Sequence, residues 1–290
     1  MIEAKYMEHE STSDILHVAM IGAEKNGKSV LASTAPGVKL YFDFDDRKAA
    51  IAGRPGVYAI TFRDPKWPRM PESAEEVLDI MTCLEKSLDL SQLVNKKNQR
   101  IFPEAKEGTI VQNIMLDSIS SFARFMQNHE MYNNEALRRT IKVGPNLEIH
   151  VPKNYDAWKA EVEGVLSVIF RCFALPINVF CMFHETAEES PASTDEKPIF
   201  TGRVSIFPVR YKAILKYFNE VWRVKLTAIP TQSGQRYYPR VYALPDYSID
   251  AATTMLLDPV EEPDIAKMIA KHKTNLAKVS ASAKVAGSSK

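Results

Sequence analysis

The chain has 290 residues, of which 45% are hydrophobic and 25% charged, and its 37 Lys and Arg residues nearly balance 36 Asp and Glu residues. The length allows one large domain or two small ones, and the formal net charge of +1 excludes a protein that coats nucleic acid with uniform positive charge. The charge is uneven, because residues 263–290 contain six lysines and one acidic residue, which gives that segment +5 and leaves −4 for residues 1–262.

The cysteines and the apolar pattern indicate the compartment. Cys83, Cys172 and Cys181 form no CxxC pair and are odd in number, as is typical of reduced thiols inside a cell. The first 14 residues are polar and acidic, and no window approaches 18 consecutive apolar residues. We therefore expect a cytoplasmic protein with no membrane partner.

Apolar runs typical of strands alternate with helical patterns through the first 250 residues. Continuous apolar strands are buried on both faces, as in parallel sheets covered by helices. The sequence therefore predicts an α/β fold with a mainly parallel central sheet flanked by helices, and its last two strands are expected to form an antiparallel extension at one edge. The expected strands are 15–21, 38–44, 57–62, 109–116, 177–183, 220–226 and 237–244, and the expected helices are 72–88, 118–130, 155–173 and 209–218.

The remaining segments divide into long loops and a C-terminal helix. Residues 89–108, 131–154 and 185–202 are predicted to be long loops or insertions. Apolar residues recur at helical spacing after Pro263, whereas residues 281–290 are too small and polar to fold. The predicted division is a core of residues 1–262 and a basic amphipathic helix with a flexible tail over residues 263–290.

The sharpest motif is a full match to GxxxxGK[ST], which follows an apolar strand and precedes a helix-compatible segment. In such a loop, glycines let successive N–H groups point at phosphate oxygens. The motif predicts nucleotide binding, with ATP as the expected ligand, by Gly22, Ala23, Glu24, Lys25, Asn26, Gly27, Lys28 and Ser29.

Two residues of this loop and one later aspartate are expected to handle phosphate and magnesium. Lys28 is expected to reach the β and γ phosphates, and the Ser29 hydroxyl to ligate Mg²⁺. Asp117 ends the predicted strand 109–116 and fits the carboxylate that holds the magnesium shell. The alternative for Asp117 is a cap on the helix that follows.

Three acidic residues lie at the end of the second predicted strand. Asp43, Asp45 or Asp46 is a candidate for the carboxylate that orients the attacking water. The alternative is a solvated acidic turn with Arg47 as its internal partner.

Together, the segments GAEKNGKS, YFDFDD, NIMLDSISSF and NVFCMFHE resemble the RecA-like ATPase core over residues 14–245. They are most similar to the compact P-loop ATPases of bacteriophages, the Sak-type group of single-strand annealing and recombinase-like proteins. The resemblance implies a RecA-like P-loop fold, DNA-stimulated ATP hydrolysis and assembly into a homo-oligomeric ring or filament. It also implies binding to single-stranded DNA, phage or host recombination proteins as partners, and a place in the host cytoplasm.

The resemblance also implies roles for individual residues. Asp45 stands where the family has the glutamate that activates water, and His184 stands where it has a polar sensor of the γ phosphate. The family completes its site with a basic residue from the adjacent subunit, for which Arg236 is the first candidate, followed by Arg240 and Arg203. The alternatives are a strand-end histidine and surface arginines.

DNA is expected at the insertion of residues 131–158 rather than at residues 185–202. The second stretch carries five acidic residues and would repel a phosphate backbone. The first mixes positive charge with aromatic rings, as single-strand grooves do, although it is equally consistent with a surface excursion. Its residues of interest are Arg138, Arg139, Lys142, Lys153, Tyr132, Tyr155 and Trp158. The basic tail is a second candidate.

The sequence therefore favours a Mg²⁺-dependent ATPase that acts on single-stranded DNA in phage recombination or replication, by annealing or strand exchange. The alternative is an ATPase whose nucleotide controls assembly or partner binding without DNA. No NKxD motif of G proteins, HExxH zinc motif or GxSxG elbow is present.

Overall fold

The computed structural model describes residues 15–63, 72–144, 147–189, 200–204, 214–231, 234–245 and 251–287. The strands are β1 (His17–Gly22), β2 (Lys39–Asp43), β3 (Val57–Thr61), β4 (Asn113–Asp117), β5 (Arg138–Gly144), β6 (Leu147–Pro152), β7 (Asn178–Glu189), β8 (Phe200–Val204), β9 (Glu220–Thr231), β10 (Gly234–Tyr242) and β11 (Val260–Glu261). The helices are α1 (Lys28–Ser33), α2 (Ser73–Lys86), α3 (Ile119–Asn133), α4 (Tyr155–Phe173) and α6 (Ile265–Gly287).

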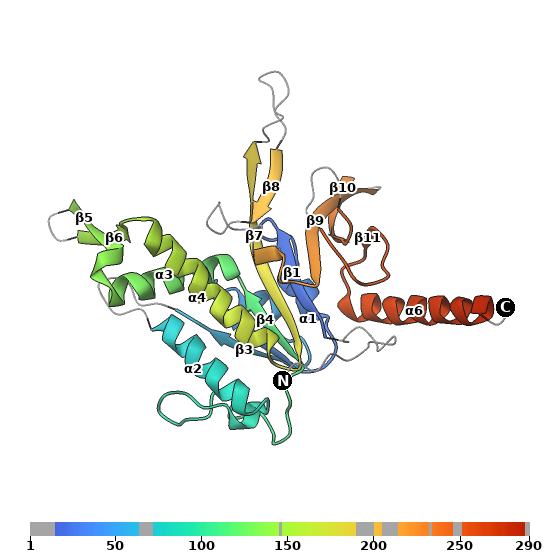
Figure 1. Cartoon of the computed structure of the whole chain (residues 1–290), viewed down its shortest axis with the longest axis horizontal. Coiled ribbons are helices and arrows are strands. Elements are labelled where there is room, and N and C mark those ends of the chain that lie inside the picture. Colours follow the sequence, from blue (N-terminus) through green and yellow to red (C-terminus); the bar gives the residue numbers. More distant parts are fainter. Residues whose placement is uncertain are drawn as a thin grey trace.

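One large sheet organises the described part of the chain (Figure 1). Its order is β11-β10-β9-β1-β7-β4-β2-β3, with β8 paired to β7. The strands from β9 to β3 in this order run parallel, and β10 and β11 continue antiparallel beyond β9. The predicted α/β fold and its antiparallel edge are therefore confirmed.

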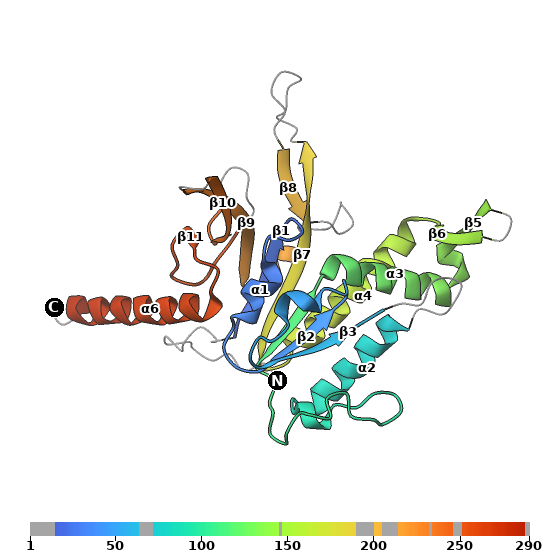
Figure 2. The same ribbon diagram turned by 180° about the vertical axis from the view of Figure 1, so that it is seen from behind.

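Helices cover both faces of this sheet because its strands are apolar on both faces. On β2, Leu40 and Phe42 belong to the core beneath α2, α3 and α4, whereas Tyr41 belongs to the core beneath α1 and α6. Helices α3 and α4 accordingly lie in front of the sheet in Figure 1 and behind it in Figure 2. Each fully buried large apolar side chain contributes roughly 1.5–3 kcal/mol to folding.

Two predicted loops contain strands. Residues 131–154 hold the hairpin β5–β6, and β7 continues to Glu189 and pairs with β8, so the loop prediction for 185–202 is wrong for 185–189 and 200–202. The hairpin pairs Thr140 with His150, whose Oγ1 and Nδ1 lie 3.0 Å apart. Its strands do alternate apolar and polar residues, as Leu147, Ile149 and Val151 of β6 show, but each alternating run is short. Residues 190–199 lie outside the described residues.

Other boundaries also differ from the prediction. Strand β4 begins only at Asn113, because Ile110 instead forms an isolated bridge with Asp89. Helix α6 continues to Gly287, so residues 281–287 are helical where an unfolded tail was expected. Ala, the strongest helix former, occupies three of these seven positions. Residues 209–213, half of the predicted helix 209–218, lie outside the described residues.

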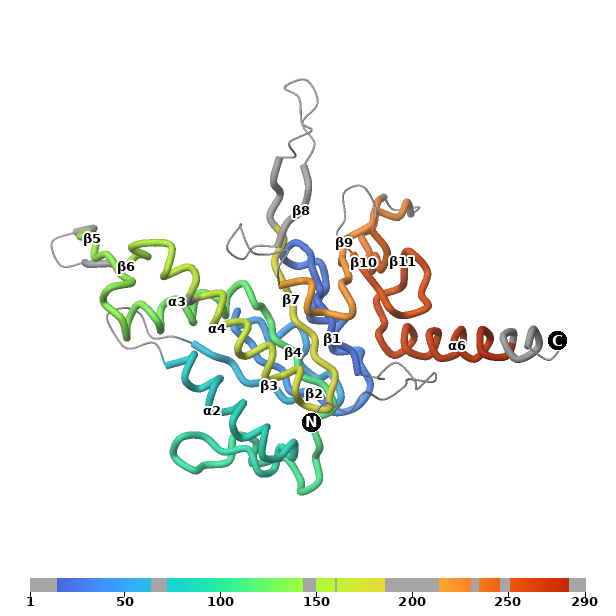
Figure 3. Tube along the Cα trace, viewed as in Figure 1, coloured from blue at the N-terminus to red at the C-terminus, as the bar shows by residue number. Residues whose placement is uncertain are grey.

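The first turns of α6 pack against the sheet, and the rest of the helix extends away from it (Figure 3). Ile265 is fully buried and Met268 is 2% exposed, both beside Trp222. The Ile265 N–H donates to Thr34 Oγ1 at 2.8 Å. The division at residue 262 stays a prediction. Among the described residues, no helix combines the length and apolar character that crossing a lipid bilayer requires.

The parallel register brings the functional candidates to one edge of the sheet. Gly22 at the end of β1 lies opposite His184 on β7, and Asp43 at the end of β2 lies opposite Asp117 at the end of β4. Ligands of open α/β sheets bind at these carboxyl ends. A glycine is required at position 22, because a Cβ there would lie 2.4 Å from the carbonyl oxygen of Val224.

A buried acid lies between α3 and α4, away from this edge. Glu161 is 5% exposed and accepts a hydrogen bond of 2.9 Å from Gln127 Nε2. Burial raises the pKa of Glu161 to about 7 from an ordinary value of 4.5, although the positive charge of Arg124 opposes the shift. The folded chain therefore keeps this proton over a pH range in which the unfolded chain releases it.

We predict that Glu161→Gln stabilises the protein at pH 8 by on the order of 1–3 kcal/mol and has little effect near pH 4.5. In the wild type, this group lowers stability as the pH rises from about 4.5 to about 7, and the neutral amide removes that loss. Urea unfolding at both pH values measures the difference. Glu163→Gln, at a side chain that is 61% exposed on the same helix, is the control. Equal pH profiles for wild type and Glu161→Gln would contradict the prediction.

Candidate nucleotide site

The loop between β1 and α1 folds into the conformation that phosphate binding requires. Gly27 and Lys25 have left-handed φ angles of 89° and 63°, which turn the loop back over the start of α1. Lys28 is 5% exposed, and its Nζ donates to the carbonyl oxygens of Gly22 at 2.7 Å and Ala23 at 2.9 Å. Burial lowers the pKa of this ammonium, and nearby carboxylates oppose that shift. The ammonium is therefore held inside the loop by weak neutral acceptors that an anion can replace.

Asp117 joins the phosphate loop to the sheet. Its Oδ2 accepts hydrogen bonds from Ser29 Oγ and from the Tyr41 hydroxyl. Asp117 is 5% exposed, and burial raises the pKa of its carboxyl while both hydrogen bonds act in the opposite direction. Ser29 and Asp117 thus lie together as the predicted magnesium role requires. The helix-cap alternative fits Ser118, whose side chain accepts from the N–H of Ser121 at the start of α3.

The three acids after β2 have three different environments. Asp43 is fully buried and accepts backbone N–H bonds from Arg47 at 2.9 Å and Lys48 at 3.0 Å, so it holds the turn together. Asp46 forms an exposed ion pair with Arg63 at 2.5 Å. Asp45 is the member of this group that lines the cavity beside the phosphate loop.

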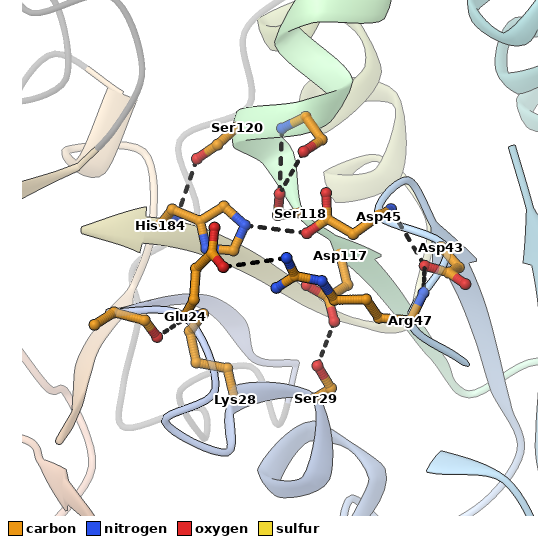
Figure 4. Close-up of polar contacts among 12 residues, drawn as sticks. Glu24, Lys28, Ser29, Asp43, Asp45, Arg47, Asp117, Ser118, Ser120 and His184 are labelled. Atoms are coloured by element: carbon orange, nitrogen blue, oxygen red, sulfur yellow. Dashed lines mark hydrogen bonds and ion pairs between the residues drawn. The ribbon is translucent and has the colours of Figure 1, made fainter. Parts of the chain in front are cut away.

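Asp45 and His184 both line that cavity and are in contact with each other (Figure 4). Asp45 Oδ2 lies 3.0 Å from His184 Nε2. The backbone N–H of His184 donates to Ser120 Oγ at 3.1 Å. Burial acts to raise the pKa of Asp45, but hydrogen bonds with His184 and Ser121 outweigh it and lower the pKa to about 2. A carboxylate with so low a pKa is a poor proton acceptor and a good hydrogen-bond acceptor, so it suits orienting a water molecule better than deprotonating it.

These side chains surround one cavity of about 260 Å³. It is lined by Lys25, Asn26, Gly27, Lys28, Ser29, Val30, Asp45, Arg47, Ala50, Asp117 and His184. Among the described residues, no three His, Cys, Asp or Glu side chains gather to hold a metal ion. A magnesium ion here would need oxygen ligands from Ser29 and Asp117 together with phosphate and water, which is how magnesium is usually bound beside nucleotides. The residues present therefore fit a magnesium nucleotide.

Comparison with known families agrees with this geometry. Residues 15–239 match a family model described as an AAA domain. The chain belongs to this AAA domain family. No curated protein matches the chain. The match confirms the P-loop ATPase part of the resemblance, and membership in the phage RecA-like group stays a prediction.

Two of the predicted trans-acting arginines, Arg236 and Arg240, lie away from the cavity of their own chain. Arg236 lies on β10 and is exposed, and Arg240, also on β10, lies 3.5 Å from Glu262. Arg203 lies on β8. Arg236 and Arg240 do not line the cavity, so a role for any of these arginines in a neighbouring subunit stays a prediction.

Two residues of the site were not predicted from the sequence. Tyr41 lies on a buried strand, where its sequence pattern is that of an ordinary core residue. Its role is visible only from the hydrogen bond to Asp117, which is 76 positions away in the sequence. Arg47 was considered only as a partner for the acidic turn, yet it lines the cavity and its Nη2 lies 3.1 Å from Glu24 Oε2. The sequence feature that could have indicated Arg47 is its position four residues after Asp43, at the end of a strand.

A third unpredicted feature is a buried ion pair beside the phosphate loop. Arg223 on β9 is 1% exposed and donates to Glu185 on β7 at 2.5 and 3.2 Å. Strand β1 lies between β7 and β9, so the pair spans the strand that leads into the loop. Glu185 had been assigned to the acidic loop.

We predict that Tyr41→Phe raises the Mg²⁺ concentration needed for half-maximal ATP turnover several-fold. Loss of the hydroxyl leaves the buried Asp117 carboxylate with one donor fewer, at a cost of roughly 1–3 kcal/mol, and frees it to turn away from Ser29. Magnesium titrations of turnover measure the effect. Tyr58→Phe, on the neighbouring strand β3, is the control. A variant that loses stability but keeps the wild-type magnesium dependence would show that Tyr41 has only a packing role.

Proposed function

We propose that this AAA domain binds ATP with Mg²⁺ and hydrolyses it. The observation that carries the proposal is the shared cavity, in which Lys28, Ser29, Asp117 and Asp45 meet from three strand ends and the phosphate loop. Lys28 would neutralise phosphate charge, and Ser29 with Asp117 would hold the ion. Bound Mg²⁺ would neutralise charge that develops on the phosphates.

Asp45 and His184 are proposed to act on the terminal phosphate side. Asp45 would release His184 and accept a hydrogen bond from a water molecule. His184 would then turn its Nε2 toward the phosphate. His184 begins the part of β7 that leads into the ribbon with β8, so this exchange would connect the cavity to that ribbon.

We expect Lys28→Ala to lower kcat/KM for ATP by at least ~100-fold, since one positioned donor to a reacting phosphate or oxyanion contributes about that much. Asp117→Asn should cause a comparable loss. Phosphate release from the full chain measures both. Lys48→Ala, which removes an exposed lysine outside the cavity, is the matched control. Wild-type turnover in Lys28→Ala would refute the proposed site.

We further propose that the ATPase acts on single-stranded DNA in recombination or replication. The hairpin β5–β6 stands at the far end of α3 and α4 (Figure 1). Arg138 holds its base, donating to the carbonyl oxygens of Met131 at 3.2 Å and Tyr132 at 3.1 Å. Arg139 and Lys153 are exposed there, as single-strand binding requires. Residues 265–287 of α6 add five lysines and no acidic residue.

We predict that Arg139→Gln weakens binding to a fluorescein-labelled oligo(dT) several-fold and reduces the slope of log K against log salt by about 0.7, the value for one lost phosphate contact. Fluorescence anisotropy at several salt concentrations measures both quantities. Lys106→Gln removes one charge from another surface loop and should have neither effect. Equal slopes for the two variants would exclude the hairpin as the DNA site.

A second candidate function is nucleotide-controlled assembly without DNA. It is favoured by α6, on which Leu276 and Val279 are 40% and 57% exposed beyond the turns that pack on the sheet. Light scattering with ATP and with ADP, run beside the DNA titration, separates the candidates. A wild-type chain that binds no DNA but changes its mass with the nucleotide would establish this second function.

A further inference from the structure

Glu24 and Arg47 face each other at the mouth of the cavity (Figure 4). Glu24 is the third residue of the phosphate loop, and Arg47 comes from the turn after β2. Arg47 Nη2 lies 3.1 Å from Glu24 Oε2, and this hydrogen bond lowers the pKa of Glu24. Arg47 also lines the cavity with Lys28 and Asp117. The guanidinium is therefore shared between an acid of the loop and the space for phosphate.

The ion pair is weak enough to exchange. The side chains of Arg47 and Glu24 are 46% and 56% exposed, and pairs this exposed contribute little to stability. A phosphate group offers the same guanidinium two parallel charge-assisted hydrogen bonds. A bound phosphate can thus replace Glu24 as the partner of Arg47.

The position of Arg47 indicates which phosphate it would contact. It follows Asp45 by two residues, and both line the same cavity with His184. On the proposed function, Asp45 and His184 act at the terminal phosphate. Arg47 therefore stands on the side of the cavity where a nucleoside triphosphate differs from a diphosphate.

We propose that Arg47 is the residue through which the chain distinguishes ATP from ADP, and that Glu24 competes with the terminal phosphate for it. This inference rests on the proposed function. The two side chains then affect ATP binding in opposite directions. A residue that only stabilised the loop would change binding of both nucleotides equally.

The test is the ratio of affinities for a fluorescent non-hydrolysable ATP analogue and fluorescent ADP, titrated with Mg²⁺ into the full chain. Arg47→Ala should weaken binding of the analogue at least ~10-fold, as loss of a charge-assisted hydrogen bond does, and change ADP binding less than ~2-fold. Glu24→Gln should tighten binding of the analogue by about 2- to 5-fold, because it removes a weak competitor for the guanidinium. In a chain that already carries Arg47→Ala, adding Glu24→Gln should no longer change the ratio of the two affinities.

The neighbouring pair Arg63 and Asp46 supplies the control. It is also exposed and lies outside the cavity, so Arg63→Ala and Asp46→Asn should leave the ratio unchanged. Arg47→Lys keeps the charge without the planar fork and should lose part of the preference for the analogue. Circular dichroism checks that each variant is folded.

Two outcomes overturn the inference while leaving the proposed function intact. In one, Arg47→Ala weakens both nucleotides equally. In the other, Glu24→Gln changes the ratio as much without Arg47 as with it, which is the result expected of simple charge repulsion. If the wild type binds neither nucleotide, the proposed function fails and this inference fails with it.

Discussion

The hydrogen bonds to the Asp117 carboxylate hold the site together. They join three elements, because Asp117 ends β4, Ser29 lies on α1 and Tyr41 lies on β2. Taking a carboxylate out of water costs several kcal/mol unless donors replace the solvent. The chain supplies two hydroxyl donors, so the acid can stay buried at the floor of the cavity while the phosphate loop remains docked on the sheet.

Paired charges surround this carboxylate and set how rigid each part of the site is. Arg223 and Glu185 form a buried pair beside the strand that enters the loop, and breaking such a pair typically costs about 3–5 kcal/mol. Glu24 and Arg47 form an exposed pair at the mouth, which costs little to open. The base of the loop is therefore fixed, whereas its outer edge can exchange partners.

The sequence was sufficient for those features that depend on local pattern. Apolar runs located the parallel strands, the glycine spacing located the phosphate loop, and a strand-end position located Asp117. The role of Tyr41 could not be predicted, because a buried aromatic residue on an apolar strand has the same local pattern whether or not its hydroxyl has a functional partner. The ion pair of Arg223 could not be predicted, because its partner Glu185 lies two strands away in the sheet. The periodicity of a sequence contains no information about such contacts. The β5–β6 hairpin was predicted as a loop although Leu147, Ile149 and Val151 alternate with polar residues, because so short an alternating run gives only a weak strand signal.

The same contacts change how net charge bears on DNA binding. Residues 185–202 carry five acids, which as a sum would repel a phosphate backbone. Glu185, however, lies on β7 with its side chain 16% exposed and its charge paired with Arg223, so it contributes little to the field outside the protein. A count of charges along the sequence treats buried and exposed groups alike. The charge count of this stretch therefore overstates its repulsion by the one acid that Arg223 neutralises.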